Sequence, residues 1–139
     1  MTIRIATNND VETILAYDKH ISVEELKNSI ALSRIYIAED DSDFIGLLRY
    51  NLFWDNTPFL NLLFIAETHR NKTYGSTLLS FWESEMRKLG YARVLTSTLS
   101  TETAQYFYQK RGYKNIGGFN LSDEPYEIIF QKEFDTSRN

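Results

Sequence analysis

Residues 58–90 read PFLNLLFIA, then ETHRNKTYG, then STLLSFWESEMRKLG, and this stretch decides the fold. Its first segment is short, apolar nearly throughout from residue 59 to residue 65, and preceded by the breaker Asp55-Asn56-Thr57-Pro58. A short apolar run bounded by a turn signal is typical of a buried strand. We therefore predict a strand over residues 59–65.

The third segment changes period and predicts a helix. Leu78, Trp82, Met86 and Leu89 recur at three- or four-residue spacing, with Leu79 on the same side and charged residues in the intervals. That spacing places one apolar stripe against a core. The glycine that follows, at position 90, is expected to end the helix, since glycine favours the left-handed conformation found there.

The turn between strand and helix, which contains residues 70–75, is the candidate binding element. The first backbone N–H groups of a helix have no acceptor within it, so such an end attracts anions. Gly75 would let a pyrophosphate approach the backbone where a Cβ would obstruct it. Similar turns are common in α/β proteins that bind no phosphate, so the turn alone leaves both alternatives open. Neither a Walker pattern nor a G-x-G-x-x-G fingerprint is present, which disfavours ordinary nucleotide sites.

Two segments resemble the GNAT superfamily of N-acetyltransferases. The stretch from Ile65 to Leu79, IAETHRNKTYGSTLL, is similar to the acyl-CoA-binding motif Arg/Gln-x-x-Gly-x-Gly/Ala. Arg70 and Gly75 match its first and last positions, whereas Thr73 stands where the family usually has its first glycine. Residues 104–113, AQYFYQKRGY, resemble the family segment A-x-x-[LF]-Y-x-x-x-G-[FY], in which a helix carries a tyrosine near the thioester sulfur.

The resemblance implies a site for acetyl-CoA. The backbone of residues 63–65 would pair with the pantetheine arm, residues 71–76 would hold the pyrophosphate, and an N–H near Ile65 could stabilise the charge that develops on the carbonyl oxygen. Thr101 stands where the family often has a cofactor-contacting asparagine, although capping the next helix explains it equally well. The implied cofactor-binding residues are Leu63, Phe64, Ile65, Arg70, Asn71, Lys72, Thr73, Tyr74, Gly75, Ser76 and Thr101.

Tyr108 is the candidate catalytic residue, as proton donor to the leaving thiolate. A phenol with a pKa of roughly 10 stays protonated at neutral pH yet can serve a basic group. The alternative is a tyrosine packed in an aromatic core patch with Tyr106, Phe107 and Tyr113, and the residues alone would favour it. The base is open: Asn61 could act only through a water, and Glu67 lies in a turn where a solvated side chain is the commoner outcome.

The acceptor is the least specified part. The resemblance points to residues 17–25, the Phe53-Trp54-Asp55 corner and the loop of residues 117–126. Aromatic side chains and carboxylates there favour a primary amine of a small molecule or peptide. The carboxylates are Asp18, Glu24, Glu25, Asp55, Asp123 and Glu124, each of which could equally be solvated surface.

Composition sets bounds on the rest. The 139 residues are one domain's worth, residues 1–139. Fifteen Lys and Arg against nineteen Asp and Glu give a net charge of −4, so no positive field recruits nucleic acid. There is no cysteine, and His20 and His69 lie far apart, so we expect neither disulfide nor metal site. No segment reaches membrane-spanning length or resembles a secretion signal, and we expect a cytoplasmic protein.

The remaining elements follow from caps and periodicity. We expect a strand over 2–6, a helix capped by Asn8 or Asn9, and a second helix opened by the capping box Ser22-Val-Glu-Glu25 with Leu26 and Ile30 buried. Strands over 34–38 and 44–53 flank an acidic turn, taken as a solvated loop.

Later elements complete the pattern. We expect a strand over 92–98 and then a helix over 102–110, capped by Thr101 and ended by Gly112. Strands over 113–116 and 126–134 should flank a loop that contains Gly-Gly and Ser-Asp-Glu-Pro. We expect a frayed end at 136–139. The order βααβββαβαββ predicts an α/β protein, a GNAT-like mixed sheet with helices on both faces.

These observations favour an acetyl-CoA-dependent N-acetyltransferase that needs no metal. A catalytically silent acyl-CoA-binding or interaction module on the same fold is the rival hypothesis, and a fold-only match without a CoA site is the third. The oligomeric state is left open, a homodimer included.

Overall fold

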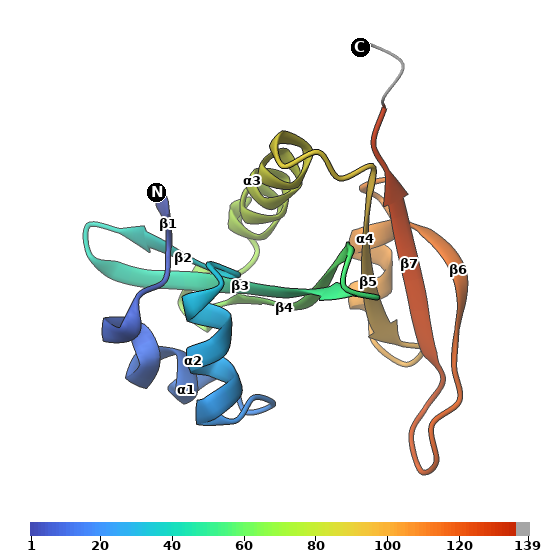
Figure 1. Ribbon diagram of the computed structural model, residues 1–139, viewed down its shortest axis with the longest axis horizontal. Helices are drawn as coiled ribbons and strands as arrows, with labels where there is room; N and C mark the ends of the chain where they lie inside the picture. Colours follow the sequence, from blue (N-terminus) through green and yellow to red (C-terminus); the bar gives the residue numbers. More distant parts are fainter. Residues whose placement is uncertain (136–139) are drawn as a thin grey trace. The chain divides into compact units, whose positions relative to one another are not determined.

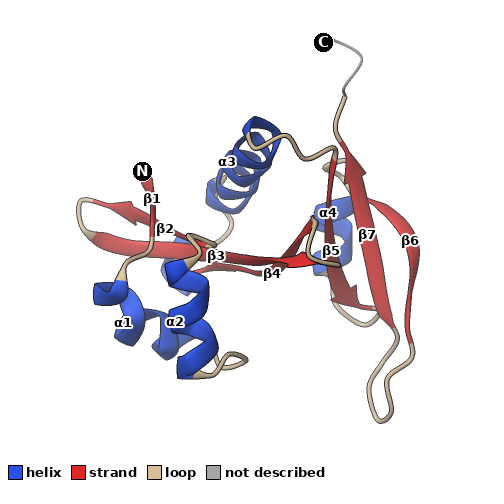
Figure 2. Cartoon of the chain, in the orientation of Figure 1, coloured by secondary structure: helices blue, strands red, loops and turns tan. Residues whose placement is uncertain are grey.

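The computed structural model describes residues 1–135, so the end predicted at 136–139 lies outside the described residues. The elements follow the predicted order (Figures 1 and 2). They are β1 Thr2–Ile5, α1 Val11–Tyr17, α2 Val23–Ala31, β2 Ile35–Asp40, β3 Asp43–Phe53, β4 Thr57–Ile65, α3 Tyr74–Lys88, β5 Arg93–Leu99, α4 Ala104–Gln109, β6 Lys114–Phe119 and β7 Glu127–Glu133, with short 3-10 helices η1 Asn8–Asp10 and η2 Glu67–His69.

The strands form a seven-stranded sheet in the order β1-β2-β3-β4-β5-β7-β6. The β4–β5 pair is parallel, and the pairs β1–β2, β2–β3, β5–β7 and β6–β7 are antiparallel. A parallel pair needs a crossover connection, and α3 supplies it. The mixed sheet confirms the predicted fold class.

The described chain divides into two compact units. Unit 1 comprises residues 1–51 and 61–82, and unit 2 comprises residues 52–60 and those from 83 onward. That the whole chain forms one domain stays a prediction.

In unit 1, helices cover both faces of the β2–β3 pair (Figure 1). On one face Ile35 and Ile37 join a buried cluster with residues of α1 and α2, among them Ile14, Leu26 and Ile30. On the other face, Tyr36 meets Phe81 of α3 edge to face at 5.4 Å between ring centroids, and Tyr50 lies 5.7 Å from Trp82. Alternation along each strand separates the two sets. This confirms helices on both faces in this unit.

The helix starts in unit 1 are only partly as predicted. Ser22 accepts a hydrogen bond from the backbone N–H of Glu25 at 3.2 Å and opens α2, as expected. The first start is wrong by one or two residues, because Thr7 forms the capping box and its reciprocal partner is Asp10. The Asp10 carboxylate also binds Arg4 through two hydrogen bonds of 2.8 Å, and that bond lowers the pKa of the carboxyl.

The acidic cluster is not simply a solvated loop. Only Asp41 and Ser42 form the turn, at φ +49° and +71°, while the flanking residues belong to β2 and β3. Glu39 accepts a 2.8 Å hydrogen bond from Nε of Arg4. The distant arginine therefore extends the strand into a segment that looks like a loop in sequence.

In unit 2 the two faces of β5 have different neighbours. Thr96 belongs to one face with Val94 and Thr98, and its hydroxyl is hydrogen-bonded to Tyr108 of α4. On that same face, Lys132 of β7 and Tyr113 both bind the carboxylate of Glu83, at 2.9 and 2.7 Å. Arg93 and Leu95 belong to the opposite face of β5, where they line a cavity.

The helix ends differ from prediction at two residues. Leu89 was predicted in the apolar stripe, but it is 65% exposed because α3 ends at Lys88 and the chain reverses at Gly90, which has φ +92° as expected. The N-cap of α4 is Thr103, not Thr101, and its side chain makes no capping hydrogen bond.

One strand boundary also differs. The Gly117–Gly118 pair was predicted in a loop but lies within β6, where a register shift follows Asn115. Gly117 has φ +128°, a conformation that favours glycine, and its N–H donates to the Asn115 side chain at 2.9 Å. Gly117 therefore allows the register shift within β6. Gly112, at φ +92°, lies at the chain reversal that was expected after α4.

Candidate active site

The turn before α3 presents a run of unpaired backbone donors. Within the described residues, none of the N–H groups of residues 71–76 donates a hydrogen bond to the chain. Asn71 adopts the left-handed conformation at φ +61°, and α3 begins three residues later. Six successive donors at a helix start are suited to an anion with several oxygens, because the helix dipole adds to the hydrogen bonds.

The backbone carbonyl of Thr73 accepts two hydrogen bonds that stabilise the conformation of this turn. The carbonyl oxygen of Thr73 accepts from the N–H of Thr77 at 2.9 Å and from the hydroxyl of Ser76 at 3.0 Å. Thr73 does not have a positive φ, so its backbone does not require the glycine that the resemblance led us to expect there. Gly75 is the second residue of α3.

Arg70 closes the turn onto β4. Its Nε donates to the carbonyl oxygen of Ile65 at 2.8 Å, and its guanidinium lies 5.5 Å from the ring centroid of Phe64. Arg70, predicted to contact a cofactor, therefore binds the end of the strand. The exposed Lys72, whose ammonium lies 6.0 Å from the Tyr74 ring centroid, is the other cation of the turn.

The end of β4 is less buried than predicted. Leu60 is buried, but residues 62–65 are only half-buried. Gly46 of β3 passes so close to this end that a Cβ there would collide with the carbonyl oxygen of Phe64 and lie 3.3 Å from Cα of Ile65. Sequence reasoning missed Gly46, although a glycine inside a predicted strand signals close backbone approach.

Tyr108 lies in unit 2 and is buried, with 7% of its surface exposed. Its ring packs edge to face on Phe107 and Tyr113, at centroid distances of 5.2 and 5.3 Å. Burial raises the pKa of the phenol to about 12, against the lowering effect of its hydrogen bond with Thr96. The hydroxyl therefore holds its proton throughout the neutral and mildly alkaline range.

Two threonines on the same face of β5 were not predicted. Thr96 donates to the carbonyl oxygen of Leu60 at 3.0 Å, which ties β5 to β4. The hydroxyl of Thr98 is buried and has no hydrogen-bond partner among the described residues. A buried polar atom without a partner is uncommon and suits a site that a polar ligand completes. Thr101, in contrast, is exposed.

The remaining candidates are separate from these groups. Asn61 donates to the side chain of Asn51 at 2.9 Å, and Glu67 is exposed at the start of η2. Asp18 was expected among carboxylates open to an acceptor, but its side chain is fully buried and binds Nε of Arg49 at 2.8 Å. This correction follows from Arg49, which is 31 positions away in sequence.

Residues 1–135 contain no group of three or more His, Cys, Asp or Glu placed to hold a metal ion. No helix in this range is long and apolar enough to cross a membrane.

The fold is that of an α/β protein in which the turn before α3, within the described residues, carries a run of unpaired backbone donors. The sequence profile of the acetyltransferase (GNAT) family matches residues 6–113, and the chain belongs to this family. No curated protein matches the chain in sequence at a significant level.

Several solved structures share this fold at low sequence identity. A GNAT-family acetyltransferase from Bacillus cereus is 26% identical with a TM-score of 0.77, and the match covers 95% of this chain and 96% of that one. The PaiA N-acetyltransferase of Thermoplasma acidophilum, in complex with coenzyme A, is 22% identical with a TM-score of 0.75 over 96% and 98% of the two chains. A GNAT-family acetyltransferase from Elizabethkingia anophelis, with acetyl-CoA bound, is 20% identical with a TM-score of 0.73 over 96% and 97%.

Proposed function

We propose that this protein is an N-acetyltransferase that moves an acetyl group from acetyl-CoA to a primary amine of a small molecule or peptide. The observation that carries the proposal is the run of six N–H groups at residues 71–76 that have no acceptor within residues 1–135, in a chain of the acetyltransferase (GNAT) family. Acetyl-CoA supplies the activated acetyl group.

The turn is assigned the pyrophosphate. Its backbone donors are pre-aligned, since the Thr73 carbonyl is already occupied by Thr77 and Ser76 and cannot turn outward without breaking two hydrogen bonds. Lys72 adds a positive charge beside them. Arg70 holds the end of β4 to the turn through its Nε, which leaves the two terminal nitrogens of its exposed guanidinium for the phosphates.

The end of β4 is assigned the pantetheine arm. Residues 63–65 are only half-buried, as suits a strand that pairs with an extended ligand, and Gly46 lets β3 support them closely from behind. In unit 2, we assign to cofactor binding the hydroxyl of Thr98, which has no partner among the described residues, and the exposed Thr101.

Tyr108 is assigned the proton that the departing sulfur needs. With a pKa of about 12 the phenol is a weak acid. Giving its proton completely to a thiolate of ordinary pKa, roughly 8.5, would cost ~5 kcal/mol. We therefore assign to Tyr108 a hydrogen bond that strengthens as charge develops on sulfur, with full transfer only late in the step.

The acceptor is assigned as a primary amine, which must be neutral to attack. The exposed Glu67 is the carboxylate of the turn region that could take its proton, whereas Asn61 is held by Asn51. Exposed carboxylates that would favour a cationic acceptor remain at Glu24, Glu25, Asp55, Asp123 and Glu124. The cytoplasm is the compartment we propose for this reaction.

The test separates binding from turnover. Calorimetry should detect acetyl-CoA but not S-acetyl-N-acetylcysteamine, which has the same thioester without the phosphates. Release of free thiol is then followed with a panel of amines, alcohols and thiols at several pH values, and rates with amines should rise with pH as the acceptor loses its proton. Binding without turnover would assign a silent acyl-CoA-binding module, and no binding of acetyl-CoA would overturn both readings. Preferential esterification of alcohols would overturn the amine assignment.

A further inference from the structure

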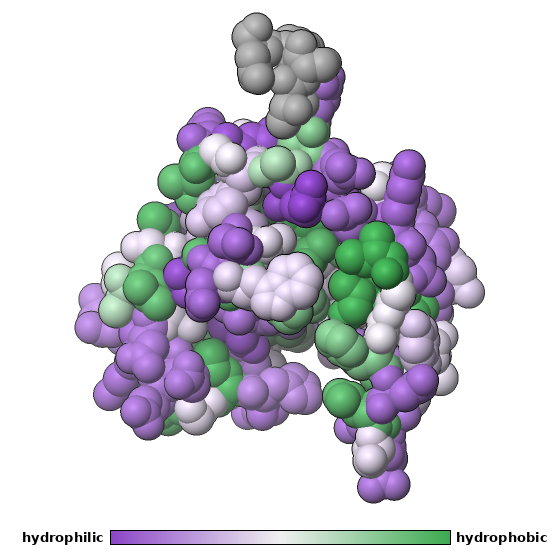
Figure 3. Space-filling view, turned by 45° about the vertical axis from the view of Figure 1, so that its right-hand side comes forward, coloured by the Kyte–Doolittle hydropathy of each residue, from purple (hydrophilic) through white to green (hydrophobic). Residues whose placement is uncertain are grey.

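Unit 2 contains a cavity on the face of its sheet opposite the helices. Its volume is about 260 Å³, and its apolar lining includes Leu95 of β5, Ile129 of β7, Phe59 of β4 and Phe119 of β6. Helix α4 and the end of α3 contact the other face, through Thr96 and Lys132. Figure 3 shows apolar residues gathered among hydrophilic ones on the surface that comes forward in that view.

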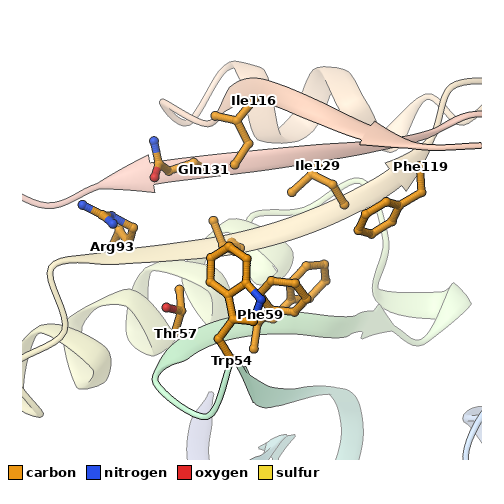
Figure 4. Close-up of a pocket in the computed structure, with 10 residues that line it drawn as sticks. Trp54, Thr57, Phe59, Arg93, Ile116, Phe119, Ile129 and Gln131 are labelled. Atoms are coloured by element: carbon orange, nitrogen blue, oxygen red, sulfur yellow. The ribbon is translucent and has the colours of Figure 1, made fainter.

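The cavity has a polar end and an apolar end (Figure 4). Arg93, Gln131 and Thr57 lie together at one end, and Phe119 and Ile129 lie at the other. Within the described residues, the side chains of Arg93 and Gln131 make no hydrogen bond or ion pair. An unpaired guanidinium at the mouth of an apolar cavity is suited to a carboxylate, because it can donate two parallel hydrogen bonds.

A strained residue forms one wall. Trp54 is 76% exposed and adopts φ +56° at the β3–β4 turn, followed by Asp55 at φ +64°. Two positive φ values define a turn that strongly prefers Asn-Gly. A bulky aromatic residue there is an outlier, and such strain gathers at functional sites. Its indole packs on Phe53 at 4.6 Å between ring centroids, so the strained turn carries the ring to the cavity.

We propose that this cavity binds a small carboxylic acid with a single aromatic ring, the ring lying against Trp54 and Phe59 and the carboxylate on Arg93. The volume is a little below the ~300–1,000 Å³ of sites for drug-sized ligands, which suits a ligand of one ring and a short chain. Gln131 and Thr57 offer further hydrogen bonds to the carboxylate at the same end.

This site is separate from the chemistry assigned to Tyr108. The side chains of Leu95 and Thr96 point to opposite faces of β5, and the cavity lies on the Leu95 face while Tyr108 is bound on the Thr96 face. A ligand in the cavity therefore has the strand between it and the phenol. The inference gives the Phe53-Trp54 corner, which the resemblance placed in the acceptor region, to a separate ligand instead, and it can fail without acetyl transfer failing.

One carboxylate, that of Glu133, lies on the same face as Arg93. Glu133 of β7 lies directly opposite Arg93 in the antiparallel pair and so belongs to the same face. No ion pair joins them in the described chain, and Glu133 does not line the cavity. Removing the Glu133 charge should therefore tighten binding of a carboxylate, whereas a merely apolar groove would not respond.

The experiment compares three probes of one shape by NMR titration of the whole chain. 3-Phenylpropionate should bind at least about tenfold more tightly than 3-phenylpropanamide, and the cationic 3-phenylpropylamine should bind least. Arg93→Gln should abolish the preference for the carboxylate, and Glu133→Gln should increase it. Lys110→Gln removes an exposed positive charge of the same unit outside the cavity and should leave all three affinities unchanged.

A second variant keeps the result independent of folding. Trp54→Asn should raise the midpoint of thermal unfolding, since asparagine suits the left-handed turn, and should still weaken all three probes. Acetyl-CoA affinity should be unchanged in both Trp54→Asn and Arg93→Gln. Equal binding of the three probes, or no binding, overturns the proposal. It is overturned likewise by a dimer that Trp54→Asn converts to a monomer, because a second copy would then occupy the face.

Discussion

The burial of Tyr108 predicts how stability and turnover change when its hydroxyl is removed. In Tyr108→Phe the ring keeps its packing on Phe107 and Tyr113, so the main loss near pH 7 is one hydrogen bond with Thr96. That loss is worth ~1 kcal/mol. The variant should therefore fold and be only slightly less stable than the parent.

The stability advantage of the parent over Tyr108→Phe, ~1 kcal/mol near pH 7, must shrink at alkaline pH and reverse slightly by about pH 11. The phenol has a pKa of 10.0 when unperturbed and about 12 in the folded chain. A raised pKa stabilises the fold below pH 10, and this contribution, equivalent to ~2.7 kcal/mol in full, is lost as the pH rises toward 12. By about pH 11 half of it, ~1.4 kcal/mol, is gone from the parent, whereas the phenylalanine variant loses nothing at this position.

Urea unfolding at about pH 7 and pH 11 measures this difference. Tyr106→Phe is the matched control, because it removes a hydroxyl from an exposed ring of the same helix. A parent-to-variant difference that stays constant between the two pH values would show that Tyr108 ionises as an ordinary phenol and would refute the reasoning from burial.

The same variant tests the proposed role in transfer. Turnover should fall by ~10²-fold with acetyl-CoA affinity nearly unchanged. Because the pKa is about 12, the parent should show no loss of rate from this group below about pH 11. If Tyr108→Phe were as active as the parent, Tyr108 would have only a packing role in the aromatic core.

Three further substitutions test other parts of the structure. Gly75→Val should weaken acetyl-CoA binding by more than about tenfold in calorimetry while thermal unfolding is unchanged, with Gly75→Ala intermediate, and unaltered affinity would remove the turn from the site. Asp18→Asn leaves Arg49 largely buried without its partner and should cost ~3–5 kcal/mol in urea unfolding, and a cost below ~1 kcal/mol would contradict a buried ion pair. Gly46→Ala forces a Cβ against the backbone of Phe64 and should destabilise the fold by ~1–3 kcal/mol in the same assay, whereas a neutral effect would show that β3 and β4 can separate.

The order of the elements could be predicted because each has a strong local signal. The four-residue spacing of Leu78, Trp82 and Met86 and the capping serine at position 22 act within one or two turns of chain, and the structure confirms them. Leu89 continues the same spacing but falls past the end of α3, where periodicity carries no information about the reversal at residue 90.

What the sequence could not predict depends on distant partners. The pairing of Asp18 with Arg49, and of Glu39 with Arg4, joins residues more than thirty positions apart, so neither carboxylate differs in sequence from a solvated one. The free N–H groups of the turn were expected from its position, whereas the inward role of Arg70 depends on the place of the Ile65 carbonyl. The resemblance drew attention to the Phe53-Trp54-Asp55 corner as part of an acceptor region, but the cavity there depends on residues of β5, β6 and β7 that are distant in sequence.

The two tryptophans give each compact unit its own optical probe. Trp82 belongs to unit 1 and is fully buried, whereas Trp54 belongs to unit 2 and is 76% exposed. Iodide should quench the fluorescence of Trp54 and spare that of Trp82, whose emission should lie at shorter wavelength. In a Trp54→Phe variant, the change of tryptophan fluorescence with denaturant concentration reports the unfolding of unit 1 alone, through Trp82. The difference between the parent and variant spectra reports unit 2, through Trp54.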